Sequence, residues 1–244
     1  MLIRVREHTP EDLEAWGRDS MDDRWWATQA SFLARVRQAL DAMAAFLSAG
    51  PCFVGVSWGK DSVVVAHLAW TLRDEHGLDV QLVHARAAEH DDAQRVIANP
   101  HVTAVRNAFL ARWPLPYEER LVRASWEGSR WVSPEGGTRD VFDAVLEGRH
   151  ISGVRAEESG RRKMRVRRWG LSTENTCAPL GWWTGRDVFA YLEAHDLPVH
   201  PAYAMTFGGR LDRARLRVSA LGGDTGRGFG RREWEEHYYR EYLR

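Results

Sequence analysis

The sequence predicts an α/β protein with a parallel β-sheet, and its apolar segments support this fold class. An apolar run of strand length at 52–56 is followed by a helical stretch at 63–73 and an alternating run at 79–84. A strand, a loop, a helix and a second strand in this order form the βαβ unit of a parallel sheet. A further run at 150–154 predicts a third strand. With 244 residues, 44% of them hydrophobic, the chain can form one large domain with appendages.

The segment before the first strand predicts a helix over 11–48. Its apolar side chains recur at spacings of three and four, which places them on one face of a helix. These side chains are Phe32, Leu33, Val36, Leu40, Met43, Ala44 and Leu47. We expect the helix to end before Pro51, since proline cannot continue the backbone hydrogen bonding.

Later segments predict three more helices and several loops. The helices cover 88–112, 184–195 and 231–243. Pro114 and Pro116 end the first of them. Glycine and serine in 118–150 favour loops around a short helix at 141–146. The strand at 150–154 is expected to lead directly into a polar, arginine-rich loop.

Composition limits the classes of protein that the chain can belong to. It has 34 basic and 34 acidic residues, so it is not generally polyanion-binding, although a local basic site is compatible with this balance. Two cysteines, Cys52 and Cys177, are too few for a disulfide framework or a metal cluster. No apolar run is long enough to span a membrane, and residues 1–10 lack the apolar core of a signal peptide. We therefore expect a cytoplasmic protein that does not associate with membranes.

The loop after the first strand has the composition of a phosphate site. Its residues are Ser57, Trp58, Gly59, Lys60, Asp61 and Ser62. At the start of a helix, free backbone N–H groups and the helix dipole attract anions. Gly59 allows close backbone approach, Lys60 adds a positive charge, and the two serines add hydroxyl donors. Asp61 is unusual in an anion site unless it binds Mg²⁺ or positions its neighbours.

The spacing excludes a Walker A loop, since aspartate follows Lys60 and the preceding glycines are too close together. The segment instead resembles the S-G-G-K-D-S loop of the PP-loop ATP pyrophosphatases, which cleave ATP between its α- and β-phosphates to adenylate a substrate. Trp58 departs from that pattern, where a small residue is usual. We expect Trp58 to cap the site or to stack on a base.

Two downstream segments resemble the phosphoadenosine phosphosulfate (PAPS) reductase-like branch of that superfamily. The segment 153–159 is similar to its G-x-R-x-x-E-S motif, and 179–188 to its P-L-x-x-W-T-x-x-D-V motif; 197–203 continues the match. The resemblance covers about residues 50–205. It implies a Rossmann-like fold of the adenine nucleotide α-hydrolase type.

The second motif adds a group of basic residues to the predicted site. Seven of them fall within 155–168: Arg155, Arg161, Arg162, Lys163, Arg165, Arg167 and Arg168. Arginine binds phosphate with two parallel hydrogen bonds, although a charged, solvated loop is the alternative. We take Gly153, Arg155, Glu158 and Arg162 as ligand-binding candidates. Thr184 and Asp187 instead suggest a structural helix cap.

The resemblance implies ATP and Mg²⁺ as ligands, with Lys60, Asp61 and Arg155 as catalytic candidates and Asp61 as a metal ligand. The reductases themselves carry a nucleophilic cysteine near the C-terminus, but 210–244 contains none. Cys177 is the nearest candidate, and we expect it to be buried and inert. No iron–sulfur cluster is expected.

Three functions stay open. The first is an ATP-cleaving enzyme that adenylates an acceptor, in sulfur transfer or nucleic-acid modification. The second is a reductase-like protein that uses an external thiol, and the third is a non-catalytic nucleotide-binding subunit. The partners implied are an adenine nucleotide, an acceptor such as nucleic acid or a sulfur-donor protein, and a second copy of the chain in a homo-oligomer.

The chain is predicted to have three parts. They are an N-terminal helical extension at 1–48, the nucleotide-binding α/β domain at 49–205 and a basic tail with a terminal helix at 206–244. Seven arginines lie between Arg210 and Arg232. The tail is compatible with a lid over phosphates, with a basic arm for nucleic acid, or with disorder.

Overall fold

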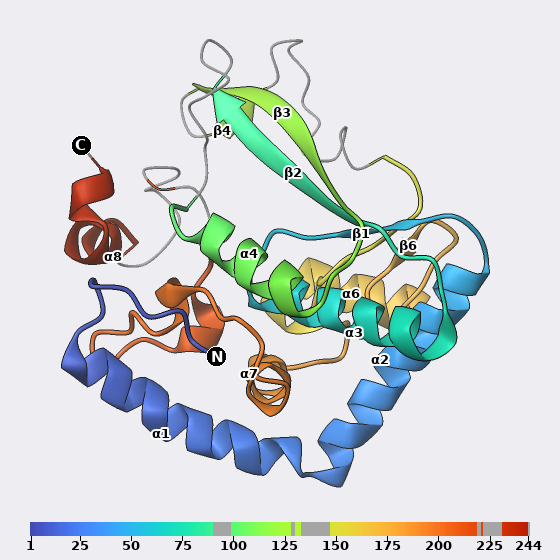
Figure 1. Ribbon diagram of the computed structural model, residues 1–244, viewed down its shortest axis with the longest axis horizontal. Coiled ribbons are helices and arrows are strands. Elements are labelled where there is room, and N and C mark those ends of the chain that lie inside the picture. The colour runs from blue at the N-terminus through green and yellow to red at the C-terminus, as the bar shows by residue number, and fades with distance from the viewer. Residues whose placement is uncertain (90–98, 128–129, 133–146, 219–220, 222–230, 244) are drawn as a thin grey trace.

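The computed structural model describes residues 1–89, 99–127, 130–132, 147–218, 221 and 231–243, and its centre is a six-stranded β-sheet (Figure 1). The strand order is β4-β3-β2-β1-β5-β6. The strands are β1 Phe53–Gly55, β2 Leu82–Glu89, β3 Tyr117–Glu127, β4 Arg130–Val132, β5 His150–Ile151 and β6 Thr176–Cys177. All adjacent pairs are parallel except β3 and β4. The predicted α/β class with a parallel sheet is confirmed.

Strand β1 is central because it pairs with β2 on one side and with β5 on the other. Val54 is in register with Leu82 of β2 and with Ile151 of β5, and all three side chains are fully buried. The predicted strands at 52–56, 79–84 and 150–154 are therefore present, although β2 begins later and extends further. The carboxyl ends of β1 and β5 lie next to each other, which brings the segments after them together.

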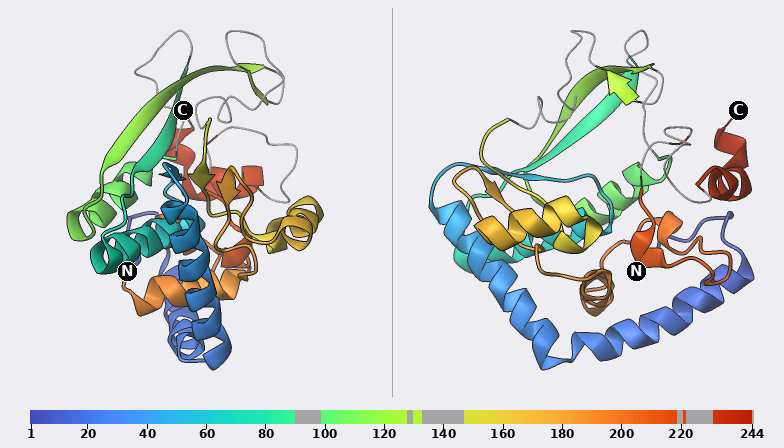
Figure 2. Two further views of the ribbon diagram at one scale, coloured as in Figure 1. Left: turned by 90° about the vertical axis from the view of Figure 1, so that its right-hand side faces the viewer. Right: turned by 180° about the vertical axis from the view of Figure 1, so that it is seen from behind.

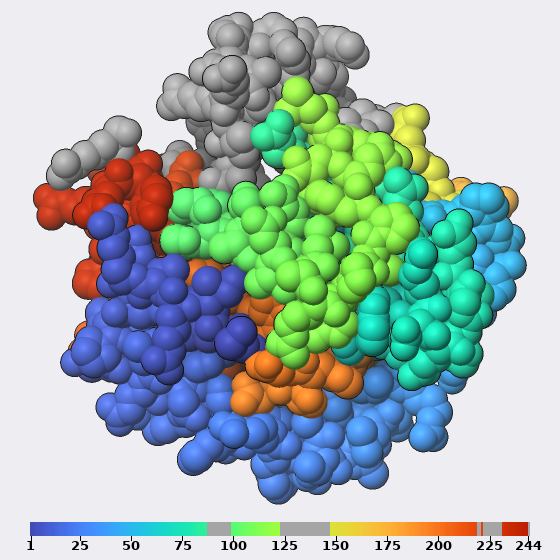
Figure 3. Space-filling view, in the orientation of Figure 1, coloured from blue at the N-terminus to red at the C-terminus, as the bar shows by residue number. Residues whose placement is uncertain are grey.

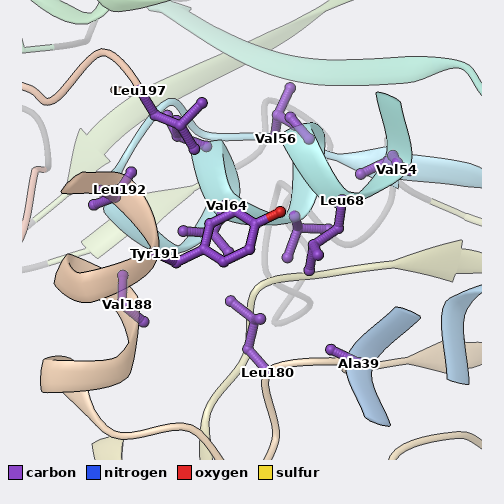
Figure 4. Close-up of a cluster of buried hydrophobic side chains, with 14 of the residues drawn as sticks. Ala39, Val54, Val56, Val64, Leu68, Leu180, Val188, Tyr191, Leu192 and Leu197 are labelled. Carbon is purple, nitrogen blue, oxygen red and sulfur yellow. The ribbon is translucent and has the colours of Figure 1, made fainter. Parts of the chain in front are cut away.

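Helix α3 (Lys60–His76) follows β1 directly and packs against α2 (Ala30–Ser48) and α7 (Gly185–Ala194). Figure 4 shows this core, in which Val64 and Leu68 of α3 lie among Val54, Tyr191 and Leu180. Val63 to Ala66 and Leu68 are almost completely buried. A helix with apolar residues on all sides is covered on all sides, so the start of α3 is held rigidly.

The N-terminal region forms two helices, where one long helix over 11–48 was predicted. Helix α1 (Pro10–Ala27) ends at Thr28, whose hydroxyl donates to the Trp25 carbonyl at 2.8 Å. Gln29 then adopts an extended conformation (ψ 137°) before α2 begins. The break lets α1 turn and pack along α7 (Figure 1). Apolar periodicity continues through such a break, so the sequence pattern could not reveal that the helix is interrupted.

The helix predicted over 88–112 is present in its second half. Residues 88–89 belong to β2, residues 90–98 lie outside the described part, and the helix is α4 (Val102–Arg112). Strand β3 falls in the region that glycine and serine content predicted to be loops. The predicted helix at 141–146 lies outside the described residues.

The arginine-rich segment is a helix, α6 (Gly160–Trp169), and the predicted loop is wrong. The N–H of Arg162 donates to the Ser159 side chain at 3.2 Å, which caps the helix. Only Val166 is fully buried, so the apolar periodicity that indicates a helix is almost absent.

The C-terminal part forms α8 (Arg231–Tyr238), followed by a 3₁₀ turn, Arg240–Tyr242. Figure 3 shows the N-terminal segment, in blue, lying against the C-terminal helix, in red. The Tyr238 hydroxyl lies 2.9 Å from the buried Asp12 carboxylate of α1. The three-part division of the chain stays a prediction. Among the described helices, none combines the length and apolarity needed to cross a bilayer.

Candidate functional site

The loop 57–62 connects β1 to α3, and its own hydrogen bonds define its shape. The N–H of Ser57 donates to the Ser62 hydroxyl at 3.2 Å, and that hydroxyl donates to the Gly59 carbonyl at 3.0 Å. Gly59 is the N-cap of α3. The first N–H groups of a helix have no partner within it and carry partial positive charge. The predicted anion-binding geometry, a loop that ends at a helix N-terminus, is therefore present.

Trp58 does not face this loop's open side. Its backbone has φ 61°, and its side chain is fully buried. The indole packs against Phe109 and Tyr117, with 5.7 Å between ring centroids in both cases. The expectation that Trp58 caps the site or stacks on a base is wrong for this structure, because the positive φ turns the side chain into the core.

Lys60 is the first residue of α3, and its side chain is only 4% exposed. Its ammonium nitrogen lies 3.1 Å from an Asp61 oxygen and 5.0 Å from the centre of the Tyr203 ring. A buried ammonium needs such partners, because desolvation of an isolated charge is costly. Asp61 is thus the counter-ion of Lys60 in the absence of ligand.

Arg155 reaches the same carboxylate from the segment after β5. Its Nε lies 2.6 Å from Asp61 Oδ1, and its side chain is 2% exposed. Glu157 accepts a further hydrogen bond from the guanidinium group. The two motifs, separated by about 90 residues in the sequence, therefore meet at Asp61.

Gly153 and Glu158 complete this junction. A Cβ atom on Gly153 would lie 3.0 Å from the Asp61 carbonyl carbon, so only glycine fits without movement of the start of α3. The Glu158 carboxylate accepts the Arg155 N–H at 3.2 Å and forms an ion pair with Arg162. Glu158 and Arg162 therefore position Arg155 and the first turn of α6.

Tyr203 is a site residue that the sequence analysis did not single out. The Lys60 N–H donates to its hydroxyl at 3.1 Å, and a Cβ on Gly59 would lie 3.2 Å from the same oxygen. Burial raises the pKa of the Tyr203 phenol, so the hydroxyl keeps its proton at neutral pH. The available signal was that Tyr203 lies in the run 197–203, which continues the resemblance to the family motifs. No chemistry in the sequence assigned the residue a role.

A cavity of about 360 Å³ opens beside these groups. Its lining residues are Lys60, Arg155, Glu157, Glu158, Asp212, Ala214, Arg215 and Arg217. The last four come from the C-terminal tail, around the 3₁₀ turn Arg213–Arg215. Three interpretations of the tail were given above: a lid over phosphates, a basic arm for nucleic acid, and disorder. The position of 212–217 in the cavity wall is compatible with the lid. Residues 219–220 and 222–230 lie outside the described part.

The donor set does not form a resident metal site. Within the described residues, no group of three or more histidine, cysteine, aspartate or glutamate side chains is arranged to hold a metal. Both Asp61 oxygens face cations, Arg155 and Lys60. Metal binding by Asp61 stays a prediction that the arrangement does not favour.

Neither cysteine has the properties of a nucleophile. Burial raises the pKa of the Cys177 thiol to about 11, and the side chain lies next to the Ala42 carbonyl of α2. Burial also raises the pKa of the half-buried Cys52. Thiolate is the reactive form of cysteine. The expectation that Cys177 is buried is confirmed.

The third motif has a structural role. Thr184 and Asp187 form the predicted capping box at the start of α7. The buried Asp187 carboxylate also accepts hydrogen bonds from Trp26 and Arg35, each at 2.9 Å. The motif therefore anchors the N-terminal helices to α7.

Comparison with known proteins supports the resemblance derived from the motifs. Residues 138–209 match the phosphoadenosine phosphosulfate reductase domain family. Phosphoadenosine 5'-phosphosulfate reductases of Xanthomonas euvesicatoria and Xanthomonas axonopodis pv. citri are 35% and 38% identical over 65 residues. These matches cover 27% of this chain and 27% of each reductase, so the chain matches about a quarter of their length. The chain is thus similar to these reductases over about a quarter of its length.

Two solved structures align with most of the chain. A PAPS reductase from Candida auris, in a phosphate complex, aligns with a TM-score of 0.47 and 11% identity, covering 77% of this chain and 90% of that one. An NMN synthetase from Francisella tularensis aligns with a TM-score of 0.44 and 11% identity, covering 88% and 96%.

Proposed function

We propose that the protein binds ATP with its phosphates at the 57–62 loop and cleaves it to AMP and pyrophosphate, thereby adenylating an acceptor. One observation carries this proposal: two almost fully buried cations, Lys60 and Arg155, line one cavity at the N-terminus of a helix. Desolvated cations beside a helix N-terminus suit a phosphate-bearing ligand.

The carboxylate of Asp61 occupies the position between the two cations that a phosphate oxygen would take. Phosphate binding would therefore exchange one anion for another around Lys60 and Arg155. Such an exchange costs less than the creation of a new charged site, because the cations are already desolvated and oriented. Asp61 then acts as a counter-ion of Lys60 and Arg155.

The reaction follows from the charges involved. The acceptor oxygen forms a bond to the α-phosphorus, and the bond from that phosphorus to the bridging oxygen breaks. Its electron pair leaves with pyrophosphate, and the acceptor proton passes to solvent. Lys60 and Arg155 stabilise the negative charge that develops on the phosphates, which is the main protein contribution to phosphoryl-type transfer.

Tyr203 and Gly153 position these groups. The phenol holds the Lys60 N–H, while the glycine allows the Arg155 segment to approach Asp61. Mg²⁺ enters this scheme as part of the Mg·ATP substrate, since Mg²⁺ commonly binds phosphates with few protein ligands.

A reductase-like activity is the second candidate, and the match of residues 138–209 to the reductase domain favours it. In this reaction an external thiolate would attack the sulfur of an adenylyl sulfate nucleotide and release the nucleotide. The thiol must come from a partner or an added dithiol, because Cys52 and Cys177 are unsuited to the attack.

Pyrophosphate release from ATP tests the first function. Wild type is compared with Lys60→Ala and with Arg73→Ala, a control at the exposed other end of the same helix. We expect release by wild type and Arg73→Ala and none by Lys60→Ala. Release that survives in Lys60→Ala would contradict the assignment, whereas sulfite release from adenylyl sulfate with an added dithiol would favour the second function. Nucleotide binding without either reaction would favour a non-catalytic subunit.

A further inference from the structure

Helix α6 presents several cations to solvent. Val166 is its one fully buried residue, and four exposed basic side chains lie around the rest of its circumference. They are Arg161, Lys163, Arg167 and Arg168. Figure 2 (left) shows the helix, in yellow, at the edge of the molecule. No ion pair joins these four residues to an acidic side chain in the described part of the chain.

Some other exposed arginines of the protein have acidic partners. Arg18, Arg232 and Arg6 form ion pairs with Glu14, Glu236 and Glu241, respectively. The chain as a whole has equal numbers of acidic and basic residues. A concentration of unpaired cations in a neutral protein produces a local positive potential that attracts polyanions.

The helix leads directly to the cavity. Arg162, in its first turn, forms an ion pair with Glu158, which lines the cavity next to Arg155. With ten residues, α6 extends roughly 15 Å from that point. A strand of nucleic acid carries one negative charge per nucleotide, so a helix of this length can contact more than one backbone phosphate.

We propose that the exposed face of α6 is the docking surface for a single strand of nucleic acid, which presents the acceptor oxygen to the cavity. The identity of the bound molecule as acceptor rests on the proposed function. The docking itself rests on the four cations, since arginine binds phosphate through its planar fork and lysine through its point charge.

Exposed apolar side chains on α6 favour nucleic acid over an acidic protein. Trp169 is 56% exposed and Met164 is 72% exposed. The Arg168 guanidinium lies 4.9 Å from the centre of the Trp169 ring. An exposed aromatic ring beside a group of cations is the combination that binds single strands, because bases stack on the ring while cations hold the backbone.

Fluorescence anisotropy with a labelled single-stranded RNA of about 20 nucleotides tests the docking surface. The test variant is Arg161→Gln/Lys163→Gln/Arg167→Gln. The control Arg4→Gln/Arg73→Gln/Arg240→Gln removes the same charge from exposed positions outside α6. We expect the test variant to bind about tenfold or more weakly than wild type, and its slope of log affinity against log salt to be smaller by about 2 to 3.

Three results would overturn the proposal. They are no RNA binding by wild type, equal losses of RNA affinity in the test and control variants, and displacement of the labelled RNA by polyglutamate more effectively than by unlabelled RNA. As a second result, we expect Trp169→Ala to bind the RNA about fivefold or more weakly than wild type, because base stacking on the ring is lost. A melting temperature equal to that of wild type shows that each variant is folded.

The failure of this proposal is separable from failure of the proposed function. Lys60→Ala is expected to bind RNA like wild type, since Lys60 is buried in the cavity. RNA binding without pyrophosphate release in wild type would refute the adenylation and leave the docking surface intact. Pyrophosphate release without RNA binding would refute the docking surface alone.

Discussion

Asp61→Asn is the substitution that most directly probes the balance of charges at the loop. Asp61 lies between Lys60 Nζ at 3.1 Å and Arg155 Nε at 2.6 Å. Its side chain is 17% exposed, while those of Lys60 and Arg155 are 4% and 2% exposed. Loss of the negative charge leaves two buried cations close together, with only Glu157 and Glu158 nearby.

The cost follows from the burial of the pair. Removing one partner of a fully buried ion pair costs about 3–5 kcal/mol. Asparagine keeps an oxygen acceptor and the position is partly exposed, so we expect the free energy of unfolding to fall by about 2–3 kcal/mol. For a chain of this size, this corresponds to a decrease of about 4–12 °C in the melting temperature.

Pyrophosphate should reverse most of this loss. In the wild type, a bound anion competes with Asp61 for the two cations, whereas in Asp61→Asn it finds them without their counter-ion. Scanning calorimetry with and without pyrophosphate measures both effects, with Asp74→Asn, exposed near the C-terminal end of α3, as the control. An unchanged melting temperature for Asp61→Asn, or weaker stabilisation by pyrophosphate than in wild type, would refute the reasoning.

Three further changes test individual parts of the account. Tyr203→Phe removes the acceptor of the Lys60 N–H and should lower the free energy of unfolding by about 1–3 kcal/mol; unchanged chemical denaturation would contradict the role given to the phenol. Burial lowers the pKa of His200 to about 3 from its usual 6.5, so the unfolded chain takes up a proton below pH 6.5 that the folded chain refuses. The free energy of unfolding therefore decreases as the pH decreases, by about 2 kcal/mol at pH 5. Between pH 7 and pH 5, the melting temperature of His200→Asn should fall less than that of wild type. Equal falls would show that His200 does not cause this pH dependence. Finally, Cys52→Ser/Cys177→Ala should release pyrophosphate at the wild-type rate, and a large loss would mean that a thiol takes part.

The central βαβ unit could be predicted because its residues obey local rules. The apolar run 52–56 and the first half of the helix that begins at Lys60 are largely buried, so composition and order were sufficient to identify them. The contact between Asp61 and Arg155 could be expected only from the order of the motifs. Its close geometry depends on Gly153, whose missing side chain is informative only once the two segments are seen together.

Other features depend on tertiary contacts that leave no local pattern. The exposed helix α6 has one fully buried residue, although Ser159 was a usable capping signal. Trp58 is turned into the core by a positive φ, which its own sequence does not indicate. The contribution of Arg215 and Arg217 to the cavity follows from the path of the tail, and neither periodicity nor charge determines that path.

Thermal unfolding with a panel of nucleotides tests the central claim most directly. Wild type and Lys60→Ala are unfolded with Mg²⁺ and ATP, AMP, adenylyl sulfate or phosphoadenosine bisphosphate. A ligand at about 100 times its dissociation constant stabilises the folded state by roughly 2.7 kcal/mol, which is readily measured. We expect ATP to stabilise wild type selectively and to have no effect on Lys60→Ala. Stabilisation by the sulfated or bisphosphate nucleotides alone would contradict the claim that the loop 57–62 binds the phosphates of ATP.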